Sequence, residues 1–348
     1  MDQVNQIRDK IDLVSFIQET VPLKKAGKNF KGLCPFHNEK TPSFMVSPEK
    51  QVWHCFGCNA GGDIYTFLMQ YERIDFPEAL RILAKRAGIE LIQTNYDSGL
   101  SSKKERLYSL NSLAAEYYHY LLTKHAVGEK ARLYLKERGL NEKIIETFQL
   151  GFAPSIGNGL SRYLLEKKKY EKEELIDAGL AFNRGRDVVD FFRGRIMFPL
   201  IDHRDNVVGF SGRILDNTKS TSKYINTRET LVYHKGEHFY GLNVTKEFIR
   251  KTGQAILVEG EFDVISSFQE GITNVVAVKG TALTQQQINL IGRYAQKISI
   301  CFDKDAAGQE AIRRSLPLIE SKGLRVTVVV IQDGKDPDEA VRKNPARI

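Results

Sequence analysis

The 348-residue sequence predicts a multidomain protein of mixed α+β and α/β class. Near the N-terminus, two pairs of metal-ligand residue types enclose short β-prone stretches, and in the middle of the chain helical patterns give way to strands. In the last third, apolar β-prone runs alternate with helical patterns, which is typical of a parallel sheet with crossover helices. Since the chain is longer than one typical core, we expect a first domain over residues 1–92, a flexible linker over 93–105, and a core made of 106–245 and 246–348.

The N-terminal region carries four residues with the spacing of zinc ligands. Cys34-x-x-His37 and Cys55-x-x-Cys58 are separated by 17 residues, and together they supply three thiolates and one imidazole for one closed, tetrahedral, structural zinc site. In a reducing compartment, a disulfide framework is the weaker interpretation of these cysteines. His54 competes with His37 for the fourth ligand position, and the tight Cys-x-x-His turn favours His37.

Two β-prone stretches between these pairs, Ser43–Val46 and Gln51–His54, predict a zinc ribbon. Helical patterns precede and follow it over residues 4–20, 63–71 and 76–87. Lysines are interleaved here with the aromatic residues Phe30, Phe36, Phe44, Trp53 and Phe56, a composition that suits single-stranded nucleic acid. Because a ribbon has few other apolar residues, a place in its small core is the stronger expectation for each aromatic side chain.

The middle of the chain predicts helices followed by a strand pair. Helical patterns cover residues 104–148, with Gly139 as a C-cap, and 160–180. Two strands, Arg193–Leu200 and Val207–Ile214, follow and are joined by a hairpin turn at residues 203–206. The segment before the first of these helices, residues 93–104, is polar and turn-rich, so we expect a flexible tether there.

Acidic residues follow three of the strands expected in the last third. Ala255–Val258 precedes Glu259 and Asp263, Lys297–Phe302 precedes Asp303 and Asp305, and Arg325–Ile331 precedes Asp336 and Asp338. Because the carboxyl ends of parallel strands share one edge of a sheet, the first four of these carboxylates should converge. Clustered carboxylates repel one another unless cations neutralise them, and oxygen ligands favour Mg²⁺ or Mn²⁺. Solvated loop carboxylates and helix N-caps are the alternative, which the repetition at three strand ends makes weaker.

The charge balance suits a polyanionic partner. The chain has 51 Lys and Arg against 43 Asp and Glu, a formal net charge of +8, as is common for proteins that bind nucleic acid. Many soluble proteins are mildly basic without such a partner, so the charge alone decides little. No apolar run reaches transmembrane length and the charged N-terminus lacks a signal-peptide pattern, so we expect a cytoplasmic protein with no membrane partner.

Taken in order, these motifs resemble the bacterial replicative primase family of the DnaG type. The runs Cys34–His37 and Phe56–Cys58 are similar to the zinc ribbon of that family. Glu-Gly-x-x-Asp at 259–263 and Asp-x-Asp at 303–305 are similar to the Toprim domain shared by primases, topoisomerases and some nucleases. The resemblance extends over essentially the whole chain, and it implies a zinc ribbon, a basic subdomain of helices and strands, and a Toprim parallel α/β sheet.

The resemblance implies a DNA-dependent RNA polymerase that makes short RNA primers on single-stranded DNA from ribonucleoside triphosphates, forming an RNA–DNA hybrid at the bacterial nucleoid. The catalytic candidates are Glu259, Asp263, Asp303, Asp305, Asp336 and Asp338. We expect Glu259, Asp303 and Asp305 to bind one or two Mg²⁺ or Mn²⁺ ions, and the other three to complete a second site or to hold waters and lysines around the first. Whether Glu259 also acts in acid/base chemistry stays open.

Runs in the basic middle resemble motifs that line the primase cleft above the Toprim sheet. By that resemblance the candidates for template, nascent-strand or triphosphate contacts are Arg138, Arg195, Arg213, Lys223, Tyr224, Asn226 and Lys235. From the residues alone, these are cations and polar groups near glycines, where backbone can approach a phosphate closely. The loop Lys279–Thr281 is either a further phosphate contact or only a turn. The family usually continues into a C-terminal domain that binds the replicative helicase, for which this chain has no room, so we expect a fragment.

Two other functions are compatible with the acidic Toprim motifs or with their combination with a zinc motif. A Toprim nuclease or topoisomerase would use the same acids to break a phosphodiester, but a topoisomerase also needs a nucleophilic tyrosine in a separate domain, which nothing in this sequence resembles. A recombination mediator joins a zinc motif to a Toprim fold without catalysis. Such proteins are shorter, and their resemblance does not cover the basic middle.

Overall fold

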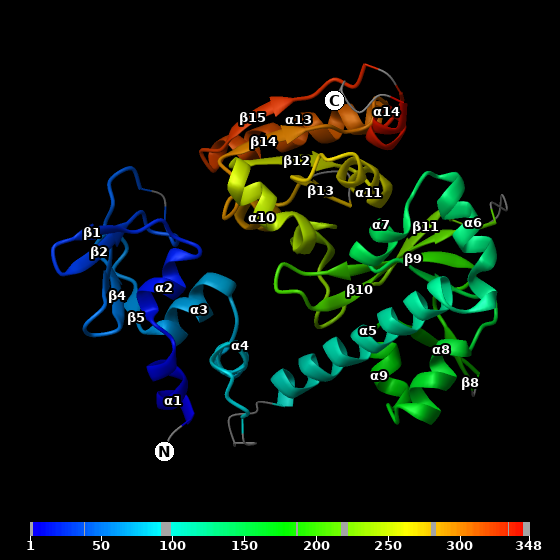
Figure 1. Cartoon of the computed structure of the whole chain (residues 1–348), viewed down its shortest axis with the longest axis horizontal. Helices are drawn as coiled ribbons and strands as arrows, with labels where there is room; N and C mark the ends of the chain where they lie inside the picture. The colour runs from blue at the N-terminus through cyan, green and yellow to red at the C-terminus, as the bar shows by residue number, and fades with distance from the viewer. Residues whose placement is uncertain are drawn as a thin grey trace. The chain divides into compact units, whose positions relative to one another are not determined.

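A computed structural model gives the structure of residues 3–37, 39–91, 99–185, 187–216, 222–279, 283–332 and 334–343 (Figure 1). The chain forms two compact units, Met1–Lys103 and Lys104–Ile348. Each unit buries its own apolar residues, which confirms the expected multidomain protein of α+β and α/β class. No described helix is long and apolar enough to cross a membrane.

The first unit is a five-stranded antiparallel sheet packed with short helices. Its elements are α1 (Gln3–Lys10), α2 (Leu13–Gln18), β1 (Lys24–Ala26), β2 (Asn29–Gly32), β3 (Phe44–Ser47), β4 (Val52–Cys55), β5 (Gly61–Gly62), α3 (Ile64–Glu72) and α4 (Phe76–Ala87). The strands pair in chain order, and Phe44 and Trp53 on the inner face are at most 1% exposed. Phe67 of α3 packs edge-on against Trp53, with ring centroids 5.8 Å apart. The core assignment is therefore confirmed for Phe44 and Trp53, whereas Phe56 is 74% exposed.

Aspartate caps fix the helix boundaries in this unit. The side chains of Asp12, Asp63 and Asp75 each accept a hydrogen bond from the backbone N–H three residues further on, and each precedes a helix. The single helix expected over 4–20 is wrong because Asp12 starts α2 as a separate helix. The helices expected at 63–71 and 76–87 are confirmed as α3 and α4.

The second unit begins within the long helix α5 (Gly99–Thr123), which corrects the expected linker and tether. Residues 99–104 are helical because they continue into a helix whose apolar side, including Leu107 and Leu110, is buried in the core of this unit. Residues 93–98 of the expected tether lie outside the described residues. The helical region expected over 104–148 is also divided, into α5, η1 (Ala126–Gly128), α6 (Glu129–Glu137) and α7 (Glu142–Thr147).

The middle of the chain forms a four-stranded antiparallel sheet in the order β11-β10-β9-β6. Its strands and neighbouring elements are β6 (Gly151–Ala153), α8 (Gly159–Arg162), η2 (Tyr163–Lys167), α9 (Lys172–Asp177), β7 (Ala181–Arg184), β8 (Asp187–Asp190), β9 (Arg195–Ile201), β10 (Val207–Ile214), β11 (Tyr224–Asn226) and η3 (Lys235–Glu237). The expected hairpin is confirmed as β9 and β10. In the pairing of β10 with β11, Ser211 lies opposite Asn226 and Arg213 opposite Tyr224. Because side chains alternate along a strand, these four share one face of the sheet.

The last part of the chain is a four-stranded parallel sheet in the order β13-β12-β14-β15. Its elements are α10 (Leu242–Thr252), β12 (Gln254–Val258), α11 (Glu261–Gln269), β13 (Val275–Ala277), α12 (Gln285–Ile291), β14 (Lys297–Ile300), α13 (Ala306–Ser321), β15 (Arg325–Val328) and α14 (Pro337–Lys343). From β12 the chain moves to one side of the sheet, and from β14 it moves to the other, so the two strands flank a topological switch point, where ligands of such sheets bind. The last strand was expected to reach Ile331, but it ends at Val328 because its partner β14 ends at Ile300.

One shared core joins the two four-stranded sheets of the second unit, and β7 and β8 form a separate two-stranded sheet. Phe198 of β9 meets Phe262 of α11 edge-on, with ring centroids 5.3 Å apart, and both belong to the same buried cluster.

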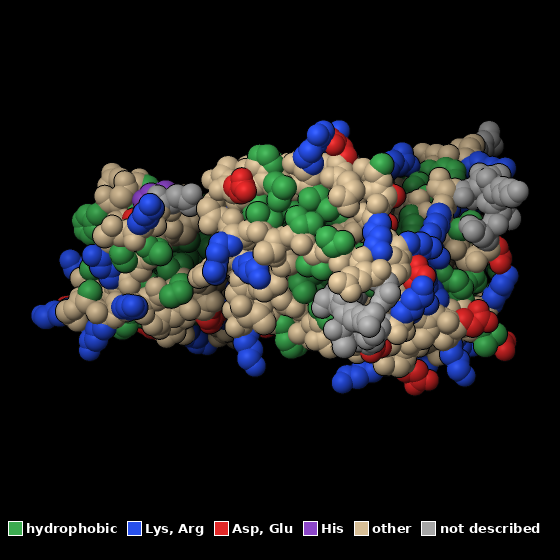
Figure 2. Space-filling view, turned by 90° about the horizontal axis from the view of Figure 1, so that it is seen from above, with side chains coloured by type: hydrophobic (Ala, Val, Ile, Leu, Met, Phe, Trp, Pro, Cys, Tyr) green, Lys and Arg blue, Asp and Glu red, His purple; other side chains and the backbone are tan. Residues whose placement is uncertain are grey.

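Surface charge by itself does not mark a site: on the face shown in Figure 2, Lys and Arg side chains are spread out, with acidic side chains among them. The functional side chains must therefore be located from their contacts.

Candidate active site and zinc site

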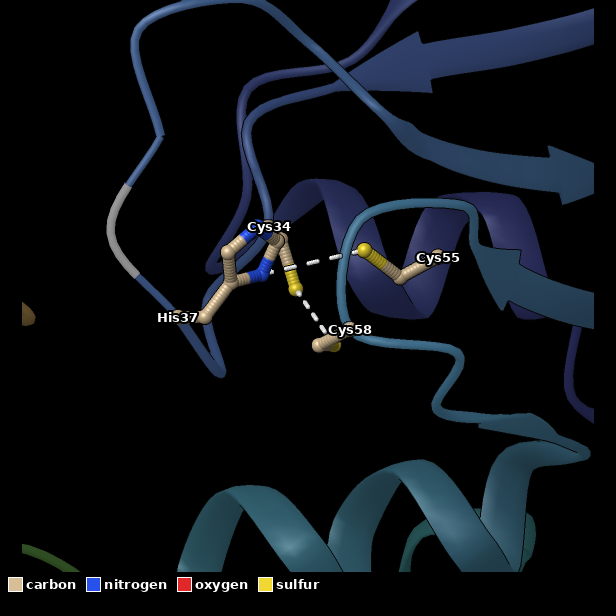
Figure 3. A group of neighbouring side chains, drawn as sticks. All are labelled: Cys34, His37, Cys55 and Cys58. Atoms are coloured by element: carbon tan, nitrogen blue, oxygen red, sulfur yellow. Dashed lines mark hydrogen bonds between the residues drawn. The ribbon is translucent and has the colours of Figure 1, made fainter.

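The four predicted zinc ligands lie together. One ligand atom from each of Cys34, His37, Cys55 and Cys58 lies within 4.8 Å of all the others, and their side chains point toward one another in Figure 3. Two thiolates bound to one zinc ion at about 2.3 Å and at tetrahedral angles lie roughly 3.8 Å apart. The sulfurs of Cys34 and Cys58 are 3.8 Å apart, as are Cys55 Sγ and His37 Nδ1. These side chains therefore fit a structural zinc ion.

The structure also decides between the two histidines. The imidazole of His54 lies 3.1 Å from Asn59 Oδ1 through its Nε2 and packs against the ring of Phe56, and it is outside the ligand group. The competing ligand assignment for His54 is therefore wrong. Its neighbour Cys55 points to the opposite face of β4, because successive residues of a strand alternate between faces.

A carboxylate that the sequence analysis missed supports the zinc ligands. Glu39 Oε2 lies 3.3 Å from His37 Nε2, and Glu39 Oε1 accepts hydrogen bonds from the backbone N–H of Cys34 at 2.7 Å and of Ser43 at 3.0 Å. A zinc-bound histidine commonly uses its second nitrogen in this way, and the contact fixes the ring. The only signal in the sequence is an acidic residue two positions after His37.

The thiols of Cys55 and Cys34 differ in pKa. Burial acts to raise the pKa of Cys55, but hydrogen bonds from Ser43 and from the backbone N–H groups of Cys58 and Gly57 lower it to about 6. Burial raises the pKa of Cys34 to about 12, and the neighbouring thiols Cys55 and Cys58 add to that rise. At neutral pH Cys55 is already largely a thiolate, so zinc binding would mainly convert Cys34 to a thiolate and release its proton.

The second site is a cleft of about 760 Å³ at the switch point of the parallel sheet. Its lining includes Glu259, Asp263, Asp303, Asp336 and Asp338 from the ends of strands and the starts of helices, and Arg138, Arg213, Lys223, Tyr224 and Asn226 across from them. Ten of the predicted site residues therefore lie around one cleft. Among the described residues the carboxylates do not form a close ligand group like that of the cysteines. Of the four expected to converge, Glu259, Asp263 and Asp303 share the cleft, and Asp305 does not line it.

Glu259 and Asp303 lie at the centre of the acidic side. Glu259 Oε1 accepts a hydrogen bond from the backbone N–H of Asp303 at 3.0 Å, which joins the ends of β12 and β14. A Cβ at Gly308 would lie 2.9 Å from Glu259 Oε1 and 2.3 Å from the Asp303 carbonyl oxygen, so this position needs glycine. Asp303 Oδ1 is buried and has no hydrogen-bond partner among the described residues. Burial, with the carboxylates of Glu259, Asp336 and Asp305, raises the pKa of Asp303 to about 6, and such uncompensated negative charge fits a divalent cation.

Two further aspartates are helix caps. Asp305 Oδ1 accepts a hydrogen bond from Gly308 N–H at 2.8 Å and caps α13, and Asp305 is not part of the cleft lining. Asp336 Oδ1 accepts from Glu339 N–H at 2.8 Å at the start of α14. The N-cap alternative therefore applies to both residues, although Asp305 and Asp336 still contribute to the raised pKa of Asp303.

Asp263 and Asp338 are buried and hold other groups. Asp263 accepts hydrogen bonds from the N–H of Gly260 at 2.9 Å and of Asp338 at 3.1 Å, and burial raises its pKa well above the ordinary value. Asp338 forms ion pairs with Arg138 at 2.7 Å and Arg342 at 3.0 Å, and it accepts a hydrogen bond from Ser266. Because two arginines already neutralise the charge of Asp338, we interpret its carboxylate as a group that holds Arg138 in place.

Two arginines flank one aromatic ring in the cleft. The guanidinium carbon of Arg138 is 4.0 Å from the ring centroid of Phe262, and that of Arg213 is 5.0 Å from it. Arg213 also donates a hydrogen bond to Tyr224 Oη at 3.1 Å. Burial and the charges of Arg213, Lys335 and Arg138 lower the pKa of Lys223. No carboxylate pairs with Arg213 among the described residues, so its charge is free to meet an anion.

Two expected contacts are placed elsewhere. Arg195 is only 3% exposed, and its guanidinium donates to the backbone carbonyls of Gly212 at 3.0 Å and Ser222 at 3.1 Å, so its expected contact with nucleic acid is wrong. Its strand is buried on both faces, and the guanidinium supports β10 and β11 from inside. Lys235 is exposed and is not part of the cleft lining. Lys279 lines the cleft, but its ammonium is buried in an ion pair, and Gly280 and Thr281 lie outside the described residues.

The partner of Lys279 is Glu261, which the sequence analysis missed. Both side chains line the cleft, and Lys279 Nζ also donates to Asn226 Oδ1 at 2.9 Å. Burial acts to raise the pKa of Glu261, but the ammonium of Lys279 holds it below its ordinary value. The two residues are 18 positions apart and on different elements, so no local pattern indicated that they pair.

Comparison with known proteins identifies the family. Family models match the chain as a CHC2 zinc finger at residues 1–98, a DNA primase catalytic core N-terminal domain at 117–246 and a Toprim-like domain at 256–341. The DNA primases of Clostridium acetobutylicum and Halalkalibacterium halodurans are 43% and 41% identical over 99% and 98% of this chain. The chain spans 57% of the length of each.

Solved structures of related primases are also similar, one over nearly the whole chain and one over 70% of it. The Aquifex aeolicus primase structure, with its zinc-binding and RNA polymerase domains, is 38% identical, with a TM-score of 0.65 over 99% of this chain and 83% of that chain. A DnaG primase catalytic domain solved bound to single-stranded DNA is 34% identical, with a TM-score of 0.64 over 70% of this chain and 76% of that chain. The chain described here therefore belongs to the DnaG family of DNA primases.

Proposed function

We propose that this chain is a DNA-dependent RNA polymerase, a nucleotidyltransferase that synthesises short RNA primers on single-stranded DNA. The observation that supports this most is a single cleft whose carboxylates lie at the switch point of a parallel sheet. The same cleft is lined by Arg213 of β10, Lys223 in the loop before β11 and Arg138 at the end of α6. A cation bound by the carboxylates and a triphosphate bound by the basic side would meet in that cleft. The relative solved with single-stranded DNA supports a DNA template for this chain as well.

Glu259 and Asp303 are the residues we propose to hold Mg²⁺ or Mn²⁺, with Asp305 and Asp336 beside them. When bound, the ion would lower the pKa of the attacking 3′-hydroxyl and neutralise charge at the transferred phosphate. The unpartnered Oδ1 of Asp303 supports this assignment, since a buried carboxylate oxygen needs a partner. The carboxyls of Asp263 and Asp338 would hold the surrounding turns, because their hydrogen bonds go to protein groups.

The basic side is proposed to bind the triphosphate and the nucleic acid. Arg213 is held by Tyr224 and by the ring of Phe262, and among the described residues neither it nor Lys223 has a carboxylate partner. Fixed cations without partners bind phosphate oxygens strongly. Arg138 would act with them, although Asp338 already neutralises part of its charge. The substrates would be ribonucleoside triphosphates and the product an RNA–DNA hybrid.

The zinc ribbon is proposed to contact the template. On the outer face of its sheet, Lys31 lies opposite Met45, which lies opposite His54, and the exposed ring of Phe56 packs on His54. An exposed aromatic ring on a sheet face that also carries a lysine can stack on an unpaired base. The expected replicative helicase partner and the expected cytoplasmic, nucleoid-associated location rest on the family.

Incubation with single-stranded DNA, labelled ribonucleoside triphosphates and Mg²⁺ or Mn²⁺ tests the proposal. Short labelled RNA that depends on the DNA and the metal is the expected product, and Asp303→Asn should abolish it. Cut DNA without RNA would indicate a Toprim nuclease, and DNA binding alone would indicate a recombination mediator. Either result would overturn the proposed polymerase.

A further inference from the structure

A buried ion pair lies at the base of the cleft. Glu261, the first residue of α11, is 4% exposed, and Lys279, at the end of β13, is 9% exposed. Taking two charges out of water carries a desolvation cost that their mutual attraction must offset. This pair lies beside the proposed metal ligands without belonging to them.

Lys279 determines how the Asn226 side chain is oriented. Its Nζ lies 2.9 Å from Asn226 Oδ1. An ammonium group can only donate hydrogen bonds, so the amide oxygen must face it, and a flipped amide would bring two donors together. The Asn226 Nδ2 group, with its two hydrogens, is then the free end of the amide. It has no hydrogen-bond partner among the described residues, and Asn226 lines the cleft.

The surroundings define what this donor can bind. Asn226 shares one face of the sheet with Ser211, Arg213 and Tyr224, and all four line the cleft. Lys279 joins Asn226 to Glu261, and the charge of Glu261 is matched by that ammonium. This face therefore offers hydrogen-bond donors and a cation, which together suit an acceptor oxygen on an anionic ligand.

We propose that the Glu261–Lys279 ion pair is a positioning device that holds Asn226 as a hydrogen-bond donor to an acceptor oxygen of the nucleotide bound in the cleft. The inference rests on the proposed function, because that function places a nucleotide there. The acceptor is an oxygen of either the phosphates or the ribose. Glu261 and Lys279 are positioning residues, since they act through Asn226.

Equilibrium binding of ATP and 2′-deoxy-ATP, measured by calorimetry with Mn²⁺ and single-stranded DNA present, tests the donor directly. Asn226→Ala should weaken ATP binding about tenfold, the typical effect of losing one hydrogen bond to a charged group. Asn226→Asp keeps the acceptor for Lys279, so it should fold normally, and it should weaken binding at least as much, because its carboxylate also repels the anionic nucleotide. An equal loss for both nucleotides excludes the ribose 2′-oxygen as the acceptor, and a loss confined to ATP identifies it. Unchanged binding in both variants would overturn the inference.

A mutant cycle tests the ion pair. Removing both charges with Glu261→Met and Lys279→Met leaves no unpaired buried charge, so the variant should fold. It should raise the KM for nucleotides several-fold with kcat within about twofold of the wild type, because a freed amide lowers ground-state and transition-state binding alike. The triple variant, which combines both methionine substitutions with Asn226→Ala, should bind nucleotide no more weakly than Asn226→Ala alone. If the triple variant loses nucleotide affinity by the product of the two separate fold-changes, the positioning role is overturned.

A matched control removes an exposed ion pair of the same unit, with Glu310→Gln and Arg314→Gln on α13. Nucleotide binding by this control should equal that of the wild type. If the double methionine variant does not fold, the two Asn226 variants still decide whether the amide is a donor. Nucleotide binding needs no RNA synthesis, so a wild type that binds ATP but makes no RNA would contradict the proposed function and leave this inference testable.

Discussion

Asp303 links the acidity of the cleft to the stability of the fold. Its pKa of about 6 is raised by burial and by three neighbouring carboxylates, whereas an unfolded aspartate ionises near pH 4. The folded chain therefore binds this proton more tightly, and it loses stability as pH rises from about 4 to 6. Without Mg²⁺ or Mn²⁺, Asp303→Asn should be more stable than the wild type at pH 8 by about 1 kcal/mol, a figure reduced for solvent screening of a half-buried group.

Urea unfolding at pH 4, 5, 6 and 8, without added divalent ions, measures this difference. The advantage of Asp303→Asn should be full above pH 6 and should shrink toward pH 4, because the wild-type carboxyl becomes protonated in both states only below that pH. The same substitution should abolish RNA synthesis, while Glu320→Gln, an exposed acid on α13, should change neither property. A stability difference that does not vary with pH would contradict the raised pKa.

Arg213 and Arg195 should respond in opposite ways to the same substitution. Arg213→Ala or Lys223→Ala should weaken nucleic-acid binding and reduce the slope of log affinity against log salt by about one each, since each lost phosphate contact releases one counterion fewer. Arg195→Ala should leave that slope unchanged and lower the free energy of unfolding by about 2 kcal/mol, because it leaves buried carbonyls without a donor. Binding titrations at several salt concentrations and urea unfolding measure both effects. Equal salt slopes in all three variants and the wild type would remove Arg213 and Lys223 from the phosphate contacts.

At the scale of the elements, zinc affinity should depend on Glu39. Glu39→Gln removes the carboxylate beside His37 Nε2, and second-shell losses of this kind typically lower metal affinity about 10–100-fold. Competition for zinc with a chromophoric chelator measures the change. Glu49→Gln, on the exposed turn between β3 and β4, is the matched control and should keep wild-type affinity. If the two variants release zinc alike, Glu39 does not support the ligand.

The features that the sequence predicted correctly are marked by residues that lie close together in the chain. Acidic residues directly after β-prone runs marked the ends of β12 and β14, and the two-residue spacings marked the zinc ligands, because each signal lies within a few positions of the chain. The pairing of Glu261 with Lys279 and the burial of Arg195 depend on contacts between separate elements, so no local pattern carried them. The start of α5 was missed because its first residues are polar, and only packing further along the helix stabilises them.

At the scale of the whole molecule, the two compact units should divide template choice from chemistry. The boundary lies at Lys103 and α5 starts at Gly99, so a fragment of residues 99–348 keeps that helix intact. It should bind metal and synthesise RNA feebly, without preferred start sites. The connection from Leu91 to Gly99 can span at most roughly 28 Å, so in the whole chain it holds the ribbon at high effective concentration.

Supplying residues 1–91 separately should therefore restore preferred start sites only in part, and only at high concentration, because a tether mainly replaces concentration. The matched control is the same fragment with Cys34→Ser and Cys58→Ser, which removes two zinc ligands and should restore nothing. Mapping the 5′ ends of the RNA on one template measures the outcome. If residues 99–348 alone start at the same positions and at the same rate as the whole chain, the ribbon does not choose the start site, and its exposed aromatic and basic face must serve another partner.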